Sequence, residues 1–164
     1  MQQPVDARTT LRITHHCAAA PARVFDAWLE PQLAGRWLFA TASRPMTSAI
    51  VDARKGGTFR FIERRAGAIV EHRGRYAGIT RPRHLAFVLH SPDCAPKKVP
   101  LGGAPHATRV TVTFAAHHNG CRLLLEHEDI PAELAAHVGA RWTGMFYGLD
   151  TVLASHAVEN TISS

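Results

Sequence analysis

The fold is decided by AELAAHVGARWTGMFYGLDTVLASHA, residues 132–157. At ~100° per residue, its apolar side chains fall within about 80° of one line, which predicts a long helix with one broad buried face. This face consists of Leu134, Ala135, Val138, Trp142, Met145, Phe146, Leu149, Val152, Leu153 and His156. The face either packs against a sheet as core, or leaves room beside its central aromatic side chains for an apolar ligand.

Glycines weaken this helix, because each costs about 1 kcal/mol relative to alanine in a helix interior. The helix is therefore expected to be stabilised by packing from outside. Gly144 and Gly148 lie four residues apart on its flank. Because glycine has no Cβ, we expect both positions to let the helix approach the sheet closely.

The length and composition of the chain limit the classes of protein to which it can belong. A chain of 164 residues is most simply one domain that folds without a disulfide or a metal ion. Its three cysteines, Cys17, Cys94 and Cys121, are odd in number and contain no C-x-x-C pair, which is typical of reduced thiols. The first residues lack the apolar run of a signal peptide, and no stretch approaches the ~18 apolar residues of a membrane span. We expect a cytoplasmic monomer or homodimer.

The net charge of +6 raises the question whether the protein binds nucleic acid. The arginines alternate with apolar residues along predicted strands, which is typical of the solvated face of a sheet. No nucleic-acid motif accompanies them. We therefore expect neither a nucleic-acid nor a membrane partner.

The order of the predicted elements gives the architecture. Apolar residues with a period of two predict strands at residues 10–17, 50–53, 58–65, 68–79, 85–89, 108–115 and 122–128. Two short helices follow the first strand, one from Pro21 to the residues before Pro31 and one at about 32–37. No helix-length crossover separates the last six strands, so they are expected to pair as antiparallel hairpins curved around the terminal helix. A long loop, 91–107, carries Lys97 and Lys98 at its tip.

Within this architecture the sequence predicts a single domain. Residues 1–9 are expected to form an N-terminal tail, 10–158 the domain, and 159–164 a C-terminal tail.

Short motifs in a fixed order connect the chain to a known family. They are APARVFDAW (20–28), RW (36–37), GGTF (56–59), HRGRYAGI (72–79), RPRHLAF (81–87), LLLEHE (123–128) and RWTGM (141–145). On these residues the chain resembles the START-like (SRPBCC) superfamily, and within it the group related to the C-terminal domain of the activator of the heat-shock protein 90 ATPase. The resemblance extends from about Leu11 to Ser155.

The resemblance implies an α+β helix-grip fold. In it, a curved seven-stranded antiparallel sheet wraps around the long C-terminal helix, two short helices close one end, and a cavity lies between sheet and helix. Members of the superfamily include lipid, hormone and polyketide binders, cyclases and a few hydrolytic enzymes, so the fold does not select a function. Leu38 replaces the second aromatic residue that usually follows Trp37, which is expected to alter the cavity mouth. The chaperone activator has a further N-terminal domain, whereas about nine residues precede the first predicted strand here.

The first functional hypothesis is binding of a small apolar or aromatic molecule, with no assigned reaction and no cofactor. An apolar cleft with a few polar groups is the usual design of such a site. The residues expected to line it are Trp28, Trp37, Phe59, Phe61, Tyr76, Phe87, Leu89, Leu125, His127, Trp142, Met145, Phe146 and Leu149.

The alternative is a cyclase- or hydrolase-type enzyme that uses Glu63, His72, Tyr76 or His127. A buried carboxylate beside a histidine can act as a general acid or base. This needs two of the four within about 3.2 Å of each other or of a bridging water. Otherwise Glu63 lies in solvent at a strand end beside its arginine neighbours, and His127 is a hydrogen-bonded core histidine.

Other chemistries find little support. His15-His16 and His117-His118 are adjacent on strands, so the two rings of each pair point to opposite faces and cannot share one ion; no metal ligands are assigned. Cys17 is a candidate nucleophile only if His15 or another base reaches it, and is otherwise an inert buried thiol. A third function, as a chaperone-associated interaction protein, would use the basic outer sheet and the loop around Lys97 and Lys98.

Overall fold

The computed structural model describes residues 7–40, 48–94 and 106–162, with side chains up to Ser155. Its elements follow the predicted order. They are β1 (Arg8–Cys17), α1 (Pro21–Leu29), α2 (Pro31–Ala34), β2 (Ser48–Val51), β3 (Thr58–Arg65), β4 (Ala68–Thr80), β5 (His84–His90), the 3-10 turn η1 (Pro92–Cys94), β6 (Thr108–His117), β7 (Gly120–Pro131), the 3-10 turn η2 (Ala132–Leu134) and α3 (Ala135–Ile162).

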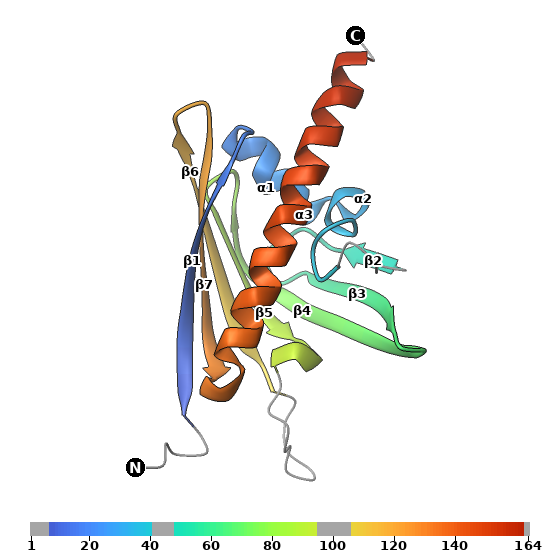
Figure 1. Cartoon of the computed structure of the whole chain (residues 1–164), viewed down its shortest axis with the longest axis vertical. Coiled ribbons are helices and arrows are strands. Elements are labelled where there is room, and N and C mark those ends of the chain that lie inside the picture. The colour runs from blue at the N-terminus through green and yellow to red at the C-terminus, as the bar shows by residue number, and fades with distance from the viewer. Residues whose placement is uncertain (1–6, 41–47, 95–105, 163–164) are drawn as a thin grey trace.

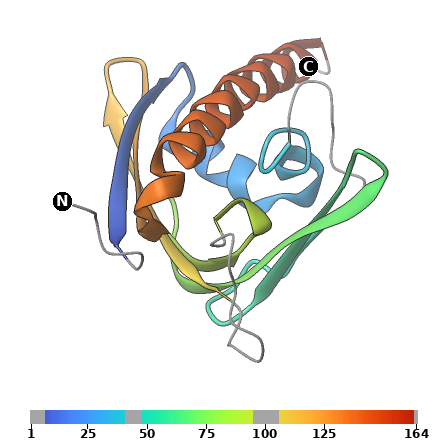
Figure 2. The same cartoon turned by 60° about the horizontal axis from the view of Figure 1, so that its bottom comes forward.

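The strands form one sheet in the order β1-β7-β6-β5-β4-β3-β2, and every neighbouring pair is antiparallel. The sheet curves around α3, while α1 and α2 lie beside the upper half of that helix (Figure 1). Figure 2 shows α3 crossing the hollow of the sheet. The predicted α+β helix-grip fold is confirmed.

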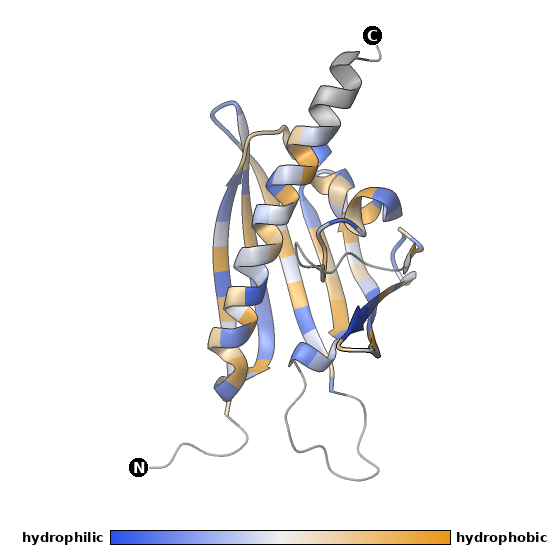
Figure 3. Ribbon diagram, turned by 45° about the vertical axis from the view of Figure 1, so that its right-hand side comes forward, coloured by the Kyte–Doolittle hydropathy of each residue, from blue (hydrophilic) through white to orange (hydrophobic). Residues whose placement is uncertain are grey.

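Apolar and polar residues alternate along the strands, as Figure 3 shows. In β3 the side chains of Phe59, Phe61 and Glu63 are buried, while Arg60 and Arg64, which alternate with them, are exposed. The exposed arginines therefore lie on the outer face of the sheet, as the alternation predicts.

The face of α3 agrees with prediction along its centre, where the side chains from Val138 to Leu153 on the predicted line are buried. Leu134 and Ala135 are only half-buried, and the side chain of His156 lies outside the described residues. The helix continues to Ile162, beyond the predicted end near Ala157. The apolar stripe that carried the prediction ends near His156, and no proline or glycine follows to end the helix.

The prediction for the two glycines of α3 is wrong. A Cβ added at Gly148 would lie 3.3 Å from Cβ of Trp37, so α3 closely approaches the segment after α2 and not the sheet. A Cβ at Gly144 would meet no atom within 4 Å. The second short helix also differs, because it ends at Ala34 and Trp37 lies in the turns that follow.

Two further points concern regions outside the core. Lys97 and Lys98 lie outside the described residues, so the chaperone-associated role stays a prediction. Among the described residues, no helix has both the length and the apolar character needed to cross a membrane.

Candidate functional site

The interior between the sheet and α3 is filled mostly by aromatic rings. All thirteen residues predicted to line a cavity are at most 5% exposed. Two cavities lie among them, one of about 20 Å³ and one of about 10 Å³. Each has room for about one water molecule. The site described here therefore consists of these two cavities and the polar groups in their walls.

Nine of the thirteen predicted residues line a cavity. Leu89, His127, Trp142 and Met145 border the first cavity, and Trp28, Phe59, Phe61, Tyr76 and Phe87 border the second. The other four, Trp37, Leu125, Phe146 and Leu149, line neither of the two and belong to the packed core. That any of these residues contacts a ligand stays a prediction.

Phe39 lines both cavities and was missed by the sequence prediction. Its ring stacks on the imidazole of His72, with centroids 4.7 Å apart and the planes at 6°. Its backbone N–H donates a hydrogen bond to Sδ of Met145 at 3.1 Å, and its φ is +60°. Leu38, the departure from the family pattern, is buried in the wall of the second cavity. The aromatic ring one position later, that of Phe39, borders both cavities.

His127 lies fully buried in the wall of the first cavity. Its Nε2 lies 2.8 Å from Oγ1 of Thr108, and its Nδ1 lies 2.9 Å from Nε1 of Trp142. Burial lowers the pKa of His127 to about 4, so the imidazole is neutral at physiological pH. The alternative of a hydrogen-bonded core histidine fits this environment.

Glu63 is fully buried, so the alternative that it lies in solvent is wrong. Its Oε1 accepts a hydrogen bond from the guanidinium of Arg65, which also binds Asp93 at 2.8 Å. Arg141 of α3 binds the same Asp93 at 3.0 Å. These ion pairs offset the cost of burying the Glu63 carboxylate, which the sequence pattern alone could not show.

His72 connects Glu63 to Ser91. The distance from its Nε2 to Oε1 of Glu63 is 3.4 Å, and its Nδ1 lies 2.7 Å from Oγ of Ser91. Burial lowers the pKa of His72, against the opposing charges of Asp93 and Glu63. A neutral histidine between a hydroxyl and a carboxylate can accept the hydroxyl proton, although Oγ of Ser91 also accepts the backbone N–H of Asp93 at 3.3 Å.

The four polar candidates are thus only partly brought together. Glu63 and His72 are neighbours at 3.4 Å, slightly beyond the distance of about 3.2 Å required for direct proton transfer. Tyr76 lines the second cavity, and burial raises its pKa well above the usual range. His127 lines the first cavity, but its hydrogen-bond partners are Thr108 and Trp142, not another of the four candidates.

Cys17 does not have the properties of a nucleophile. Burial, with smaller contributions from Asp150 and Cys121, raises the pKa of its thiol to about 12. The thiol is therefore protonated at neutral pH, and a thiolate is the form that attacks.

The sequence comparison decides the family. The family model described as Activator of Hsp90 ATPase homolog 1-like protein matches residues 18–154. The chain belongs to this family. The predicted resemblance to the AHSA1-like group is confirmed, and the residues of both cavity walls lie within the matched range.

Solved structures from bacteria have the same AHSA1-like fold. A protein from Chromobacterium violaceum has a TM-score of 0.74 at 22% identity, over 87% of this chain and 95% of its own. An AHSA1-like protein from Aeromonas hydrophila has a TM-score of 0.74 at 21% identity, over 91% and 94%. A protein of unknown function from Staphylococcus aureus has a TM-score of 0.77 at 15% identity, over 92% and 96%. At these identities the likeness concerns the fold alone. A search of curated proteins finds no match.

Proposed function

We propose that this AHSA1-like protein binds a small molecule with an aromatic or apolar body and a hydrogen-bond acceptor. The binding space forms when the ring of Phe39 leaves its place between the two cavities. The observation that carries the proposal is that Phe39 lines both of them. Without its ring, the first cavity beside Trp142 and Met145 joins the second beside Trp28 and Phe59.

The size of the joined space limits the ligand. Apolar cavities of about 150 Å³ bind molecules the size of benzene. Two cavities of about 20 and 10 Å³, together with the space of a phenylalanine ring, suit a molecule with a single ring. The surrounding aromatic side chains favour a flat body, because aromatic pairs gain about 0.5–1.5 kcal/mol beyond the burial of area.

Trp28 supplies the reason for an acceptor. Trp28 lines the second cavity, and its buried indole Nε1 has no hydrogen-bond partner among the described residues. The indole N–H groups of Trp37 and Trp142 are both paired, with Ala27 O at 3.0 Å and with His127 at 2.9 Å. An unpaired buried donor costs about 1–3 kcal/mol, which a ligand oxygen would recover.

Two phenylalanines provide a matched test. Phe39 and Phe114 are both 3% exposed, and only Phe39 belongs to the walls of the two cavities. We expect Phe39→Ala to bind acetophenone at least tenfold more tightly than wild type, as measured by calorimetry and ligand-observed NMR. Wild type is expected to bind weakly, because Phe39 must first move. Phe114→Ala should bind no better than wild type.

A second comparison tests the acceptor. In the Phe39→Ala background, acetophenone should bind about tenfold more tightly than ethylbenzene, which has the same shape without the oxygen. Adding Trp28→Phe should abolish that preference. The proposal is ruled out if Phe39→Ala and Phe114→Ala bind acetophenone equally, or if a folded Phe39→Ala protein does not bind it.

A second candidate function is a hydrolase-type reaction, favoured by the contacts of His72 with Ser91 and Glu63. Ser91 lines the first cavity, so its hydroxyl could meet an ester bound there. His72 would accept the hydroxyl proton while Glu63 holds the imidazole. This candidate requires that a fluorophosphonate probe label Ser91 in wild type and that His72→Gln suppress the labelling. An unlabelled serine would eliminate it.

A further inference from the structure

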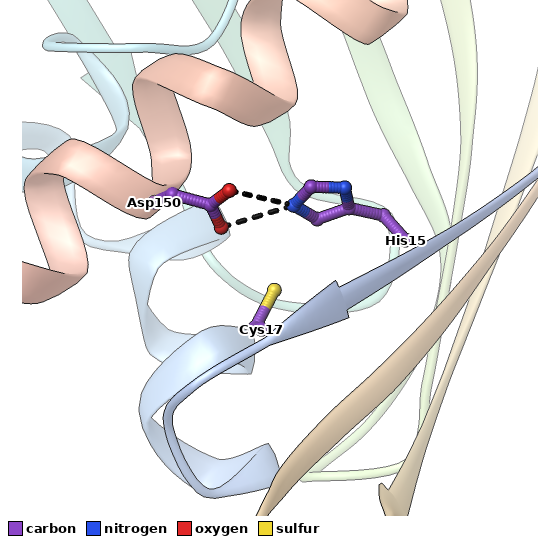
Figure 4. A group of neighbouring side chains, drawn as sticks. All are labelled: His15, Cys17 and Asp150. Atoms are coloured by element: carbon purple, nitrogen blue, oxygen red, sulfur yellow. Dashed lines mark hydrogen bonds and ion pairs between the residues drawn. The ribbon is translucent and has the colours of Figure 1, made fainter.

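Three side chains of different chemistry meet where β1 ends beside α3 (Figure 4). His15 and Cys17 come from β1, and Asp150 comes from α3. One ligand atom from each residue, the imidazole Nε2, the thiol Sγ and a carboxylate oxygen, lies within 4.8 Å of the other two. This cluster shares no residue with the walls of the two cavities, so it is independent of the proposed function.

The fold brings these three side chains together. His15 and Cys17 are two apart on a strand, so both side chains point to the same face. That face is covered by α3, where Asp150 follows the buried Leu149. Nε2 of His15 lies 2.9 Å from Oδ1 and 3.1 Å from Oδ2 of Asp150. The imidazole is held in place by Phe146, whose ring stacks on it with centroids 5.1 Å apart.

The cluster is accessible from one side. Cys17 is 5% exposed, whereas the side chains of His15 and Asp150 are 18% and 42% exposed. An ion can therefore reach the thiol past the carboxylate, and a water molecule can remain bound to it from the solvent side. The half-exposed carboxylate can also adjust its position without disturbing the core.

We propose that His15, Cys17 and Asp150 form a binding site for a zinc ion, with water as the fourth ligand. Cys17 binds the ion as a thiolate, and the proton of its thiol is released to solvent as the sulfur–zinc bond forms. Sulfur, imidazole nitrogen and carboxylate oxygen are the three ligand types that zinc takes in proteins, and three protein ligands plus water is a common arrangement. Magnesium and calcium prefer oxygen ligands alone, so the thiol and imidazole disfavour them.

The distances require only a small adjustment. Zinc lies about 2.0–2.3 Å from such ligands, so tetrahedral ligand atoms are about 3.3–3.7 Å apart. Compared with the 2.9 Å between His15 and Asp150, that pair must separate by a few tenths of an ångström. The atoms that are farthest apart, within 4.8 Å, must approach by about 1.5 Å at most. Small rotations of the three side chains would supply both changes.

A second thiol lies next to this site. Cys121 of β7 is the direct cross-strand partner of Cys17. It is not among the three residues whose ligand atoms cluster, so we assign it no ligand role. Because the two cysteines face each other, the experiments must be done under a phosphine reductant that keeps both thiols reduced.

Cobalt is the probe for this site, because Co²⁺ occupies zinc sites and a cobalt–thiolate bond gives a near-ultraviolet charge-transfer band. We expect wild type to develop this band to saturation at a single ion per chain, and zinc to displace the cobalt. Cys17→Ser should abolish the band. His15→Ala and Asp150→Asn should each weaken binding at least about tenfold, as measured against a competing chelator.

Matched variants separate this site from other ligands. Cys94→Ala and Cys121→Ala remove the other two buried thiols and should leave the band unchanged. A double His117→Ala, His118→Ala variant removes two imidazoles of the β6–β7 hairpin and should also bind cobalt normally. Circular dichroism checks that each variant is folded. No saturable band in wild type, a band that survives Cys17→Ser, or loss of binding in the hairpin variant would overturn the assignment.

Discussion

The indole N–H of Trp142 on α3 donates a hydrogen bond to Nδ1 of His127 on β7 over 2.9 Å. Because Nδ1 accepts, the ring proton of the neutral imidazole lies on Nε2, which donates to Oγ1 of Thr108 at 2.8 Å. The Thr108 hydroxyl donates in turn to Leu89 O at 3.4 Å. The neutral histidine therefore links the helix to three adjacent strands, and protonation would turn the Nδ1 acceptor into a donor facing the Trp142 donor.

We predict that His127 makes the protein less stable in acid. Its pKa is about 4 in the folded protein and ordinarily 6.5, so between these values the unfolded chain binds a proton that the folded chain does not. The free energy of unfolding therefore falls as the pH decreases from about 6.5 to about 4, by roughly 3 kcal/mol in total, and this residue adds no further loss below that. His72, whose pKa is also lowered by burial, contributes in the same direction.

Urea unfolding of wild type and His127→Gln at several pH values from 7 to 4 checks this prediction. Between pH 6.5 and 4 the free energy of unfolding should fall less for the variant than for wild type, because the amide of glutamine does not titrate. Parallel pH profiles for the two proteins would show that His127 is not responsible.

The Glu63–Arg65 ion pair should matter far more than a similar pair on the surface. Glu63→Gln removes the buried carboxylate charge that pairs with the half-buried guanidinium of Arg65, and we expect a loss on the order of 2–4 kcal/mol. Glu71→Gln breaks the pair with Arg60, in which the side chains are 52% and 37% exposed, and should cost less than about 1 kcal/mol. Chemical denaturation of both variants at neutral pH measures the difference; equal losses would contradict the structural role assigned to Glu63.

The two glycines of α3 should respond in opposite ways to alanine. Gly144→Ala adds a methyl group to open space, so helix propensity should raise stability by up to about 1 kcal/mol. Gly148→Ala places the same methyl group 3.3 Å from Cβ of Trp37. Trp37 cannot easily move aside, because it is buried and its N–H is bonded to Ala27 O. We expect Gly148→Ala to be about 1 kcal/mol or more less stable than Gly144→Ala in thermal unfolding. The reverse order would mean that Trp37 moves freely.

The sequence predicted the strands and the central face of α3 because both depend on local periods of two and 3.6 residues. It also predicted that the aromatic residues of the interior are buried. It could not predict that Phe39 lies among them, since Phe39 belongs to a turn and contacts Met145 and His72, which are distant from it in the sequence.

The polar groups illustrate the same limit. Glu63 was assigned to solvent as one alternative because arginines follow it, yet the fold buries Glu63 and places the half-buried Arg65 between it and Asp93. Asp150 lies 135 residues from His15 in the sequence, so no spacing rule could join it to β1. Such meetings depend on tertiary packing, which residue periodicity does not describe.

The backbone of Phe39 has an energetic consequence for the closed interior. Its φ of +60° lies in the left-handed region, which costs a bulky residue on the order of 1 kcal/mol or more. The contacts of its ring and N–H offset that cost only while the ring stays in place. If the ring leaves its place and loses these contacts, the backbone strain is released as well. The free-energy difference between the closed form and an open form, in which the two cavities join, is therefore smaller than the lost contacts alone would give. For each kcal/mol released, the open population rises about fivefold. The conformation of one residue thereby helps to set how often the interior admits a ligand.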